Sequence, residues 1–111
     1  VAEFIRETIF EQYSQEIPYA VYVSVEEFRE SQDPIYVKAN LLVEKESQKM
    51  IVIGKDGRSI KRLGELSRAK IEQFTERRIY LDLWVKVLPN WRSKKKELER
   101  LGFHLPRAKR K

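Results

Sequence analysis

Three segments of the chain alternate between apolar and polar residues, and their spacing constrains the fold more than any other feature. They cover residues 19–28, 35–44 and 79–87, and each predicts a half-buried β-strand. The turn sequence Ser31-Gln32-Asp33-Pro34 separates the first two, so we expect an antiparallel hairpin. A long segment separates the last two, so we expect them to be parallel and joined by a right-handed crossover.

Residues 2–13 and 58–77 have the apolar periodicity of amphipathic helices, and a further helix is predicted over residues 91–101. The apolar stripe of the second helix contains two small residues, Gly64 and Ser67, where another element can approach closely. With every helix packed on the same face of the three strands, the chain is expected to form an α+β domain with a mixed sheet.

Residues 47–53 fit two structures. Ser47 is a suitable N-cap for a helix, whereas the β-branched run Ile51-Val52-Ile53 favours a strand. The periodicity of this short segment does not decide between them.

Composition narrows the functional classes. The chain has 111 residues, enough for one domain with one core, and its lack of cysteine excludes disulfides, cysteine-ligated metals and thiol catalysis. A single histidine, His104, argues against a multi-histidine metal site or a serine–histidine triad, and no cofactor is expected. No apolar run reaches the roughly 20 residues of a membrane helix, so an integral membrane segment is not expected and a cytosolic setting is the default.

Charge is distributed unevenly along the chain. The net charge is +6, yet residues 1–35 carry −6 and residues 86–111 carry +8. This asymmetry indicates a polyanionic partner, with a solvated surface and a frayed tail as the alternative interpretation.

The motif Gly54-Lys55-Asp56-Gly57 lies between an apolar segment and a basic helix. Glycine leaves room for a nucleic-acid backbone, and the N-terminus of the following helix favours a phosphate. A GxxG sequence alone also fits a plain tight turn, but its context here favours RNA. The candidate RNA-binding residues are an apolar platform for bases (Met50, Ile51, Ile53), a backbone clamp (Gly54, Lys55, Asp56, Gly57) and the start of the next helix (Arg58, Ser59, Lys61, Arg62).

Other motifs argue against an enzyme or leave alternatives open. Gly57 is followed by Arg58-Ser59 and has no glycine five places before it, so the phosphate-binding loop of nucleotide hydrolases is absent. The carboxylate pair Glu26-Glu27 is expected on opposite faces of a strand. Tyr80 and Trp84 share one strand face, which either is covered by the C-terminal segment or a neighbouring domain, or stacks on bases.

Two stretches together, SQKMIVIGKDGR (Ser47–Arg58) and YLDLWVKVLPNWR (Tyr80–Arg92), resemble the C-terminal KH domain of the Era family of bacterial GTPases. The resemblance extends to about residue 103. It implies a type II KH fold in which Gln48–Ile53 form a short helix, and we adopt that interpretation. The chain is thereby divided into a KH domain at residues 1–104 and a basic tail at residues 105–111.

The resemblance also implies a function. Domains of this family bind the single-stranded 3′ end of small-subunit (16S) ribosomal RNA and assist assembly of the small ribosomal subunit. The family's N-terminal GTPase domain is a possible partner, and the family implies a cytoplasmic location with peripheral association at the inner membrane. This chain is expected to have no catalytic activity of its own. The competing hypothesis is an interaction domain that docks on a GTPase or ribosomal protein without reading RNA.

Overall fold

The computed structural model describes residues 1–91. Its elements follow in the order α1 (Ala2–Gln12), α2 (Ile17–Ala20), β1 (Tyr22–Arg29), β2 (Ile35–Val43), α3 (Glu46–Ile53), the 3-10 turn η1 (Lys55–Gly57), α4 (Arg58–Thr75) and β3 (Ile79–Val87). The predicted helix over residues 91–101, His104 and the basic tail at 105–111 fall outside the described residues, except for Trp91.

The three strands form one sheet in the order β1-β2-β3. β1 and β2 are antiparallel, whereas β2 and β3 are parallel, which confirms the predicted hairpin and crossover. A register shift between Val25 and Glu27 makes Glu26 a bulge that the alternation did not reveal. Since β3 pairs on one side only, its other edge is free of strand partners in the described sheet.

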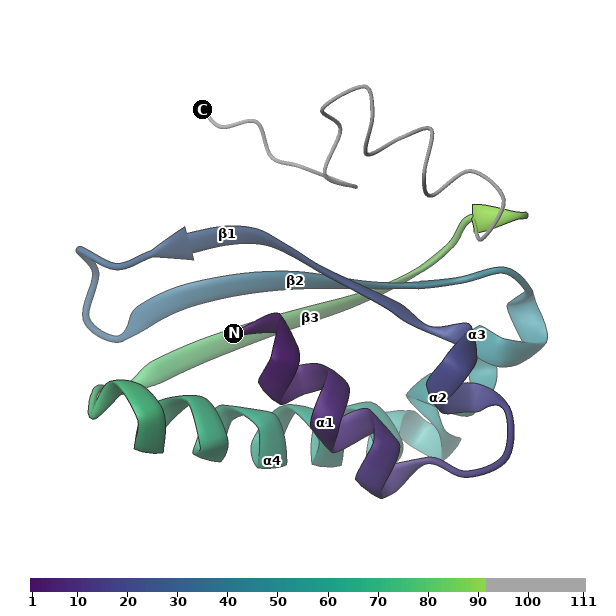
Figure 1. Cartoon of the computed structure of the whole chain (residues 1–111), viewed down its shortest axis with the longest axis horizontal. Coiled ribbons are helices and arrows are strands. Elements are labelled where there is room, and N and C mark those ends of the chain that lie inside the picture. Colours follow the sequence, from purple (N-terminus) through teal and green to yellow (C-terminus); the bar gives the residue numbers. More distant parts are fainter. Residues whose placement is uncertain (92–111) are drawn as a thin grey trace.

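The described helices pack on one face of this sheet, as predicted, with α1 and α4 side by side beneath the strands (Figure 1). The inward residues of β2 are fully buried, and they meet apolar residues of α1, α3 and α4. The central buried side chains are Ile5, Ile9, Val37, Ala39, Leu41, Val43, Val52, Leu63 and Ile71. This arrangement confirms the α+β class with a three-stranded mixed sheet.

Several sequence-based expectations were wrong in detail. The first strand begins at Tyr22 and not at residue 19, because residues 17–20 form α2, with Pro18 in its first turn where proline is tolerated. Ser47 is not the N-cap of α3, since the helix begins at Glu46 and the N-cap is Lys45. The Gln48 side chain caps this helix instead, because its Oε1 accepts a backbone hydrogen bond from Lys45 at 3.0 Å.

The apolar stripe predicted for α4 consists of Ile60, Leu63, Gly64, Ser67, Ile71 and Phe74. It is buried at Leu63, Ser67 and Ile71 and partly buried at Ile60 and Gly64, but it is not buried at Phe74. Phe74 is 73% exposed, and its ring lies 5.4 Å from that of Phe4 on α1. At this end of α4 the stripe therefore leaves the core, and Phe74 lies exposed beside Phe4.

The outer face of the sheet is covered at one end. Trp91 is buried there with Leu42, and its Nε1 donates a hydrogen bond to the Ala20 carbonyl at 3.2 Å. None of the helices within residues 1–91 combines enough length with enough apolar character to span a bilayer.

Candidate nucleic-acid interface

The GxxG motif forms a tight turn between α3 and α4. Gly54 N donates to the Met50 carbonyl at 2.8 Å, and Gly57 N donates to the Gly54 carbonyl at 3.1 Å. Three of its residues have positive φ angles, namely Gly54 at 78°, Asp56 at 56° and Gly57 at 74°. Only glycine and, less often, Asp or Asn adopt such angles without strain, so the motif has a conformational reason as well as a chemical one.

The two glycines have different roles. A Cβ added at Gly54 would lie 2.3 Å from the Ser59 Oγ and 2.9 Å from the Ser59 backbone nitrogen, so this position is closed by the first turn of α4. A Cβ added at Gly57 would meet nothing within 4 Å. Gly54 therefore serves the packing of the turn itself, whereas the space beside Gly57 is open to an approaching molecule.

Helix α1 holds this turn from behind. Gln12 Nε2 donates to the Ser59 carbonyl at 2.8 Å, and Tyr13 Oη donates to the Val52 carbonyl at 2.6 Å. Burial raises the pKa of Tyr13 to about 12, so its hydroxyl remains a donor at neutral pH. These two residues could not be predicted from the sequence, because the C-terminal end of an amphipathic helix carries no signal that marks them.

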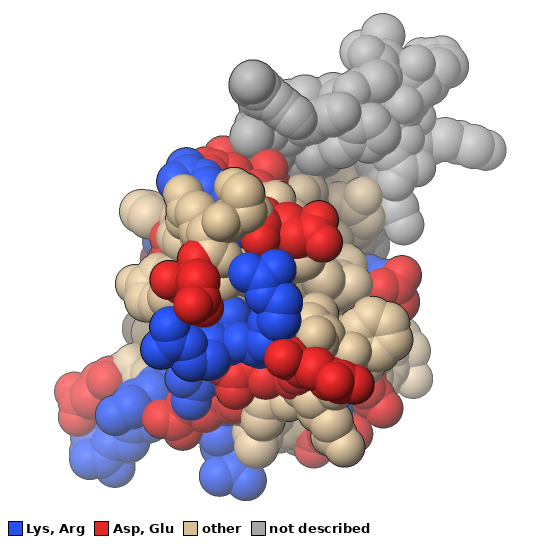
Figure 2. All heavy atoms as spheres, turned by 90° about the vertical axis from the view of Figure 1, so that its left-hand side faces the viewer, with Lys and Arg blue, Asp and Glu red and all other residues tan. Residues whose placement is uncertain are grey.

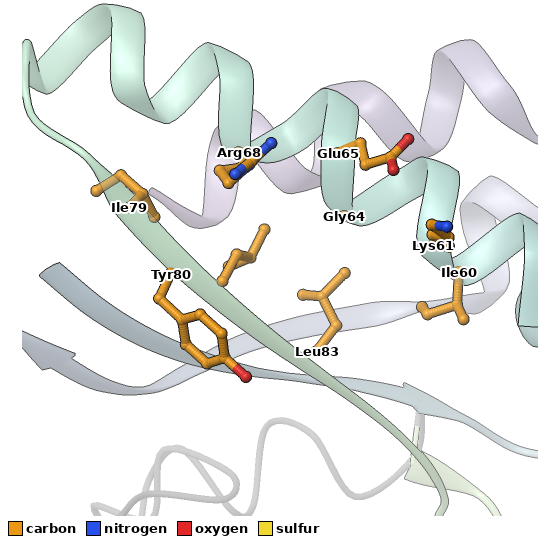
Figure 3. A pocket seen from close by; sticks show the side chains of 9 residues that line it. Ile60, Lys61, Gly64, Glu65, Arg68, Ile79, Tyr80 and Leu83 are labelled. Atoms are coloured by element: carbon orange, nitrogen blue, oxygen red, sulfur yellow. The ribbon is translucent and has the colours of Figure 1, made fainter. Parts of the chain in front are cut away.

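An open groove of about 410 Å³ runs between α4 and the free edge of β3 (Figure 3). Its lining combines aliphatic side chains with three charged ones and consists of Ile60, Lys61, Gly64, Glu65, Arg68, Ile79, Tyr80, Leu81 and Leu83. A Cβ at Gly64 would lie 3.7 Å from Leu83 Cδ1, which is an ordinary van der Waals distance, so the approach of the strand at this position does not require a glycine.

The sequence-predicted site residues are divided between two places. Lys61 is the one that lines the groove. Met50 and Ile51 are 66% and 53% exposed on α3, and Ile53 is partly buried. The remaining predicted residues form the turn and the first turns of α4, where Lys55, Asp56, Arg58 and Arg62 are exposed and Gly54, Gly57 and Ser59 partly buried.

Most residues of the groove were not among the RNA-binding residues predicted from the sequence. Ile79, Leu81 and Leu83 were predicted as inward residues of a strand, and Leu81 and Leu83 are only partly buried because β3 is an edge strand. Their alternation in the sequence is that of any half-buried strand. The groove is visible only once α4 and β3 are placed together.

The basic residues of α4 are not equally available. Among the cations of the GxxG turn and of α4, five form no ion pair within residues 1–91: Lys55, Arg58, Lys61, Arg62 and Arg68. Lys70, by contrast, is bound to Glu7 at 3.4 Å and Glu11 at 2.8 Å and fastens α4 to α1. The uncompensated positive charge therefore lies toward the GxxG end of α4.

The opposite end of the molecule is also rich in charge, but the charges there are balanced. Figure 2 shows Lys and Arg side chains gathered at the centre of this end, with Asp and Glu side chains around them. Arg77 donates to the carbonyls of Glu30 at 3.0 Å and Gln32 at 2.9 Å, which holds the β1–β2 turn, and Arg78 pairs with Asp33 at 3.3 Å. Among residues 1–91, no cluster of three or more His, Cys, Asp or Glu side chains is arranged to hold a metal ion.

Known proteins share this architecture. The chain is 51% identical over 104 residues to the GTPase Era of Elusimicrobium minutum and 45% identical over 106 residues to the chloroplastic GTPase ERA1 of Zea mays. Each match covers 93% of this chain, but 35% of the bacterial and 25% of the maize protein. The chain thus spans about a third of the bacterial relative's length. The sequence of this chain contains no phosphate-binding loop.

Two solved structures are similar to it, each with a TM-score of 0.81, 32% sequence identity and coverage of 92% of this chain and 35% of the other. One is Aquifex aeolicus Era bound to GDP and aluminium fluoride, and the other is Era in complex with MgGDPNP and nucleotides 1506–1542 of 16S ribosomal RNA. The family model of the KH domain matches residues 16–92, which include the GxxG turn, α4 and β3. The chain therefore belongs to the KH-domain family, and it corresponds to the KH domain of Era rather than to the GTPase domain.

Proposed function

We propose that this chain binds single-stranded RNA at the GxxG turn and along the α4–β3 groove. The observation that carries the proposal is the open space beside Gly57, which adjoins uncompensated cations at the start of α4, the helix that also lines the groove. The 16S ribosomal RNA in the similar Era complex supports the same ligand class. We further propose that the target is the 3′ end of 16S ribosomal RNA and that binding serves assembly of the small ribosomal subunit.

The turn is suited to a phosphate of the RNA backbone. No side chain fills the space beside Gly57, so the sugar–phosphate chain can come within contact distance of the peptide backbone. The N-cap position of α4 is Gly57 and forms no side-chain cap. The Arg58 N–H already donates to the Lys55 carbonyl, so the positive end of the helix dipole, rather than that first N–H group, favours an anion here. Arg58 and Arg62 add positive charge in the same turns.

The groove is suited to unstacked bases. Leu81, Leu83 and Ile60 provide apolar surface against which base faces can lie, and Lys61 and Arg68 provide donors along its rim. Glu65 adds a carboxylate acceptor, which suits an exocyclic amino group of a base. The part of Era that this chain matches thereby supplies RNA binding, and GTP hydrolysis belongs to the remainder of the longer relatives.

A matched pair of substitutions at Gly57 tests the proposal. Gly57→Asn and Gly57→Asp add side chains of the same size, and both residues tolerate the left-handed conformation of this position. Only aspartate adds a negative charge. We expect Gly57→Asp to weaken RNA binding by several kcal/mol more than Gly57→Asn, because like charges at an interface are that unfavourable.

Binding is measured by fluorescence anisotropy with a labelled RNA of the 16S 3′ end and a scrambled RNA of equal length, over a salt series. Circular dichroism melting of the same samples shows that each variant is folded. A preference for the 16S sequence that persists at high salt supports readout in the groove. Equal binding of both RNAs with a steep salt dependence, or equal affinities of the two Gly57 variants, contradicts the proposal.

A further inference from the structure

Three planar groups lie in a row across the outer face of the sheet. Arg29 on β1 is paired in register with Tyr36 on β2, and Tyr36 is paired with Tyr80 on β3. The Arg29 guanidinium carbon lies 4.8 Å from the centre of the Tyr36 ring. The Tyr36 and Tyr80 rings are stacked, with centroids 5.8 Å apart and an interplanar angle of 18°.

The row is held in place by polar contacts. Tyr36 Oη donates a hydrogen bond of 2.6 Å to Asp82, which lies two residues beyond Tyr80 on the same face of β3. This hydrogen bond, together with burial, raises the pKa of Tyr36 to about 12. Arg29 is paired with the Glu27 carboxylate. The rings are therefore ordered before any ligand arrives, which lowers the entropic cost of stacking a further group on them.

The row ends at the free edge of the sheet. Tyr36 covers one face of the Tyr80 ring, and because β3 is the edge strand the other face is turned away from the sheet. Tyr80 is 57% exposed. It also lines the α4–β3 groove, near the end where Ile79 and Arg68 lie (Figure 3).

We propose that the free face of Tyr80 stacks on a nucleobase of the single-stranded RNA where the RNA leaves the groove. The inference rests on the proposed function and adds to it a stacking site outside the GxxG turn and the apolar groove floor. A nucleobase is planar like the groups already in the row, and aromatic residues are the usual platforms for unstacked bases.

The charge of the groove favours an RNA base, rather than an aromatic side chain of a protein, as the group that stacks on the free face of Tyr80. Lys61 and Arg68 line the same groove and form no ion pair within residues 1–91, whereas Glu65 is its single acidic residue. A phosphodiester chain that follows this rim meets net positive charge on its way to Tyr80.

RNAs of two lengths separate the stacking site from the groove. The shorter has about four nucleotides, the length that a KH groove holds, and the longer extends the same sequence at both ends. We expect Tyr80→Ala to weaken the longer RNA roughly 5- to 150-fold, the loss that corresponds to one base stack, and to weaken the shorter RNA by a much smaller factor, since Tyr80 lines only one end of the groove. Tyr80→Phe retains a ring and is expected to bind both RNAs as the parent does.

Trp84→Ala is the matched control. Trp84 is 48% exposed on the same sheet face and lies beneath Lys38, but it does not line the groove. We expect no change in RNA affinity. A fluorescent 2-aminopurine, moved stepwise along the longer RNA, is expected to be quenched at one terminal position by the parent and by Tyr80→Phe, and not by Tyr80→Ala.

Each outcome decides the inference. Equal affinity of the parent and Tyr80→Ala for the longer RNA overturns it, as does an equal loss with Trp84→Ala or an equal loss for the shorter RNA. If Tyr80→Ala does not fold, Tyr80→Leu keeps apolar packing without a ring and replaces it. A parent chain that binds neither RNA refutes the proposed function and this inference together. If Gly57→Asp weakens both RNAs while Tyr80→Ala weakens neither, the inference alone fails.

Discussion

Replacing Gly54 by alanine should disrupt the fold of the turn far more than the same change at Gly57. Gly54 has φ 78° and ψ 173°, a region that only glycine adopts readily, and forcing another residue into it costs about 1–3 kcal/mol. The added Cβ would also lie 2.3 Å from Ser59 Oγ and 2.6 Å from Ser59 Cβ. Such overpacking costs about 1–3 kcal/mol more, so we expect a total loss of stability of roughly 2–6 kcal/mol.

Gly57→Ala is the control for this change. Gly57 has φ 74° and ψ 14°, the left-handed helical region, and its Cβ would meet no atom within 4 Å. Only the backbone penalty of about 1–2 kcal/mol applies. The difference between the two variants therefore measures the contact between Gly54 and the first turn of α4.

Urea unfolding monitored by far-UV circular dichroism gives the free energy of unfolding for each variant. Ser59→Gly removes both the Oγ and the Cβ that collide with the new methyl group. In a double-mutant cycle we expect it to recover at least about 0.5 kcal/mol of the loss at Gly54. If Gly54→Ala is no less stable than Gly57→Ala, or if Ser59→Gly recovers nothing, the structural role assigned to Gly54 is wrong.

Three further changes test other parts of the structure. Tyr13→Phe removes the hydrogen bond to the Val52 carbonyl and should lower the free energy of unfolding by about 1 kcal/mol. The pKa of Tyr13 is about 12 in the folded chain, above its ordinary value of 10.0. The stability due to its neutral form is therefore complete below pH 10 and is lost as the pH rises through about 12. In urea unfolding experiments, the free energy of unfolding should fall less in alkali for Tyr13→Phe than for the parent. Lys70→Ala should lower stability by less than about 1 kcal/mol and leave the salt dependence of RNA binding unchanged, since its charge is already paired with two α1 glutamates. A flatter log–log plot of RNA affinity against salt concentration, measured by fluorescence anisotropy, would contradict this. Deleting residues 107–111 should flatten the log–log salt slope by roughly 1.4–2.1 if the tail contacts two or three phosphates, and an unchanged slope would show that it contacts none.

Much of the fold could be predicted because its main signals are periodic. The alternation in β2 placed Val37, Ala39 and Leu41 in the core, and the long crossover determined that β2 and β3 are parallel. The α3 segment is different, since Ile51-Val52-Ile53 favours a strand by propensity. Only the resemblance to a known family indicated the helix that the structure contains.

The details that were missed depend on contacts that the sequence pattern does not encode. Pro18 suggested the end of a segment, yet the same residue fits the first turn of α2. The cap of α3 comes from Gln48, whose side chain reaches back to the N-terminus, and not from Ser47.

The candidate site was predicted in part. The GxxG turn is a local motif, so its position and the open space at Gly57 could be expected from the sequence. The groove is a tertiary feature that exists because α4 packs beside β3 at the free edge of the sheet. The row that ends at Tyr80 depends on the register of three strands, which alternation alone does not give.

Amide chemical-shift mapping by NMR, with the isotope-labelled chain titrated with the single-stranded 16S 3′-end RNA, tests the central claim most directly. We expect the largest shifts on residues 54–68, from the GxxG turn along α4, and on residues 79–83 of β3, with Gly57 among the most affected. In Gly57→Asp the shifts at the turn should require far more RNA. Shifts confined to the outer sheet face around Trp84 or to the exposed surface of α1, or an absence of saturable shifts, would contradict the assignment of the turn and groove as the RNA-binding site.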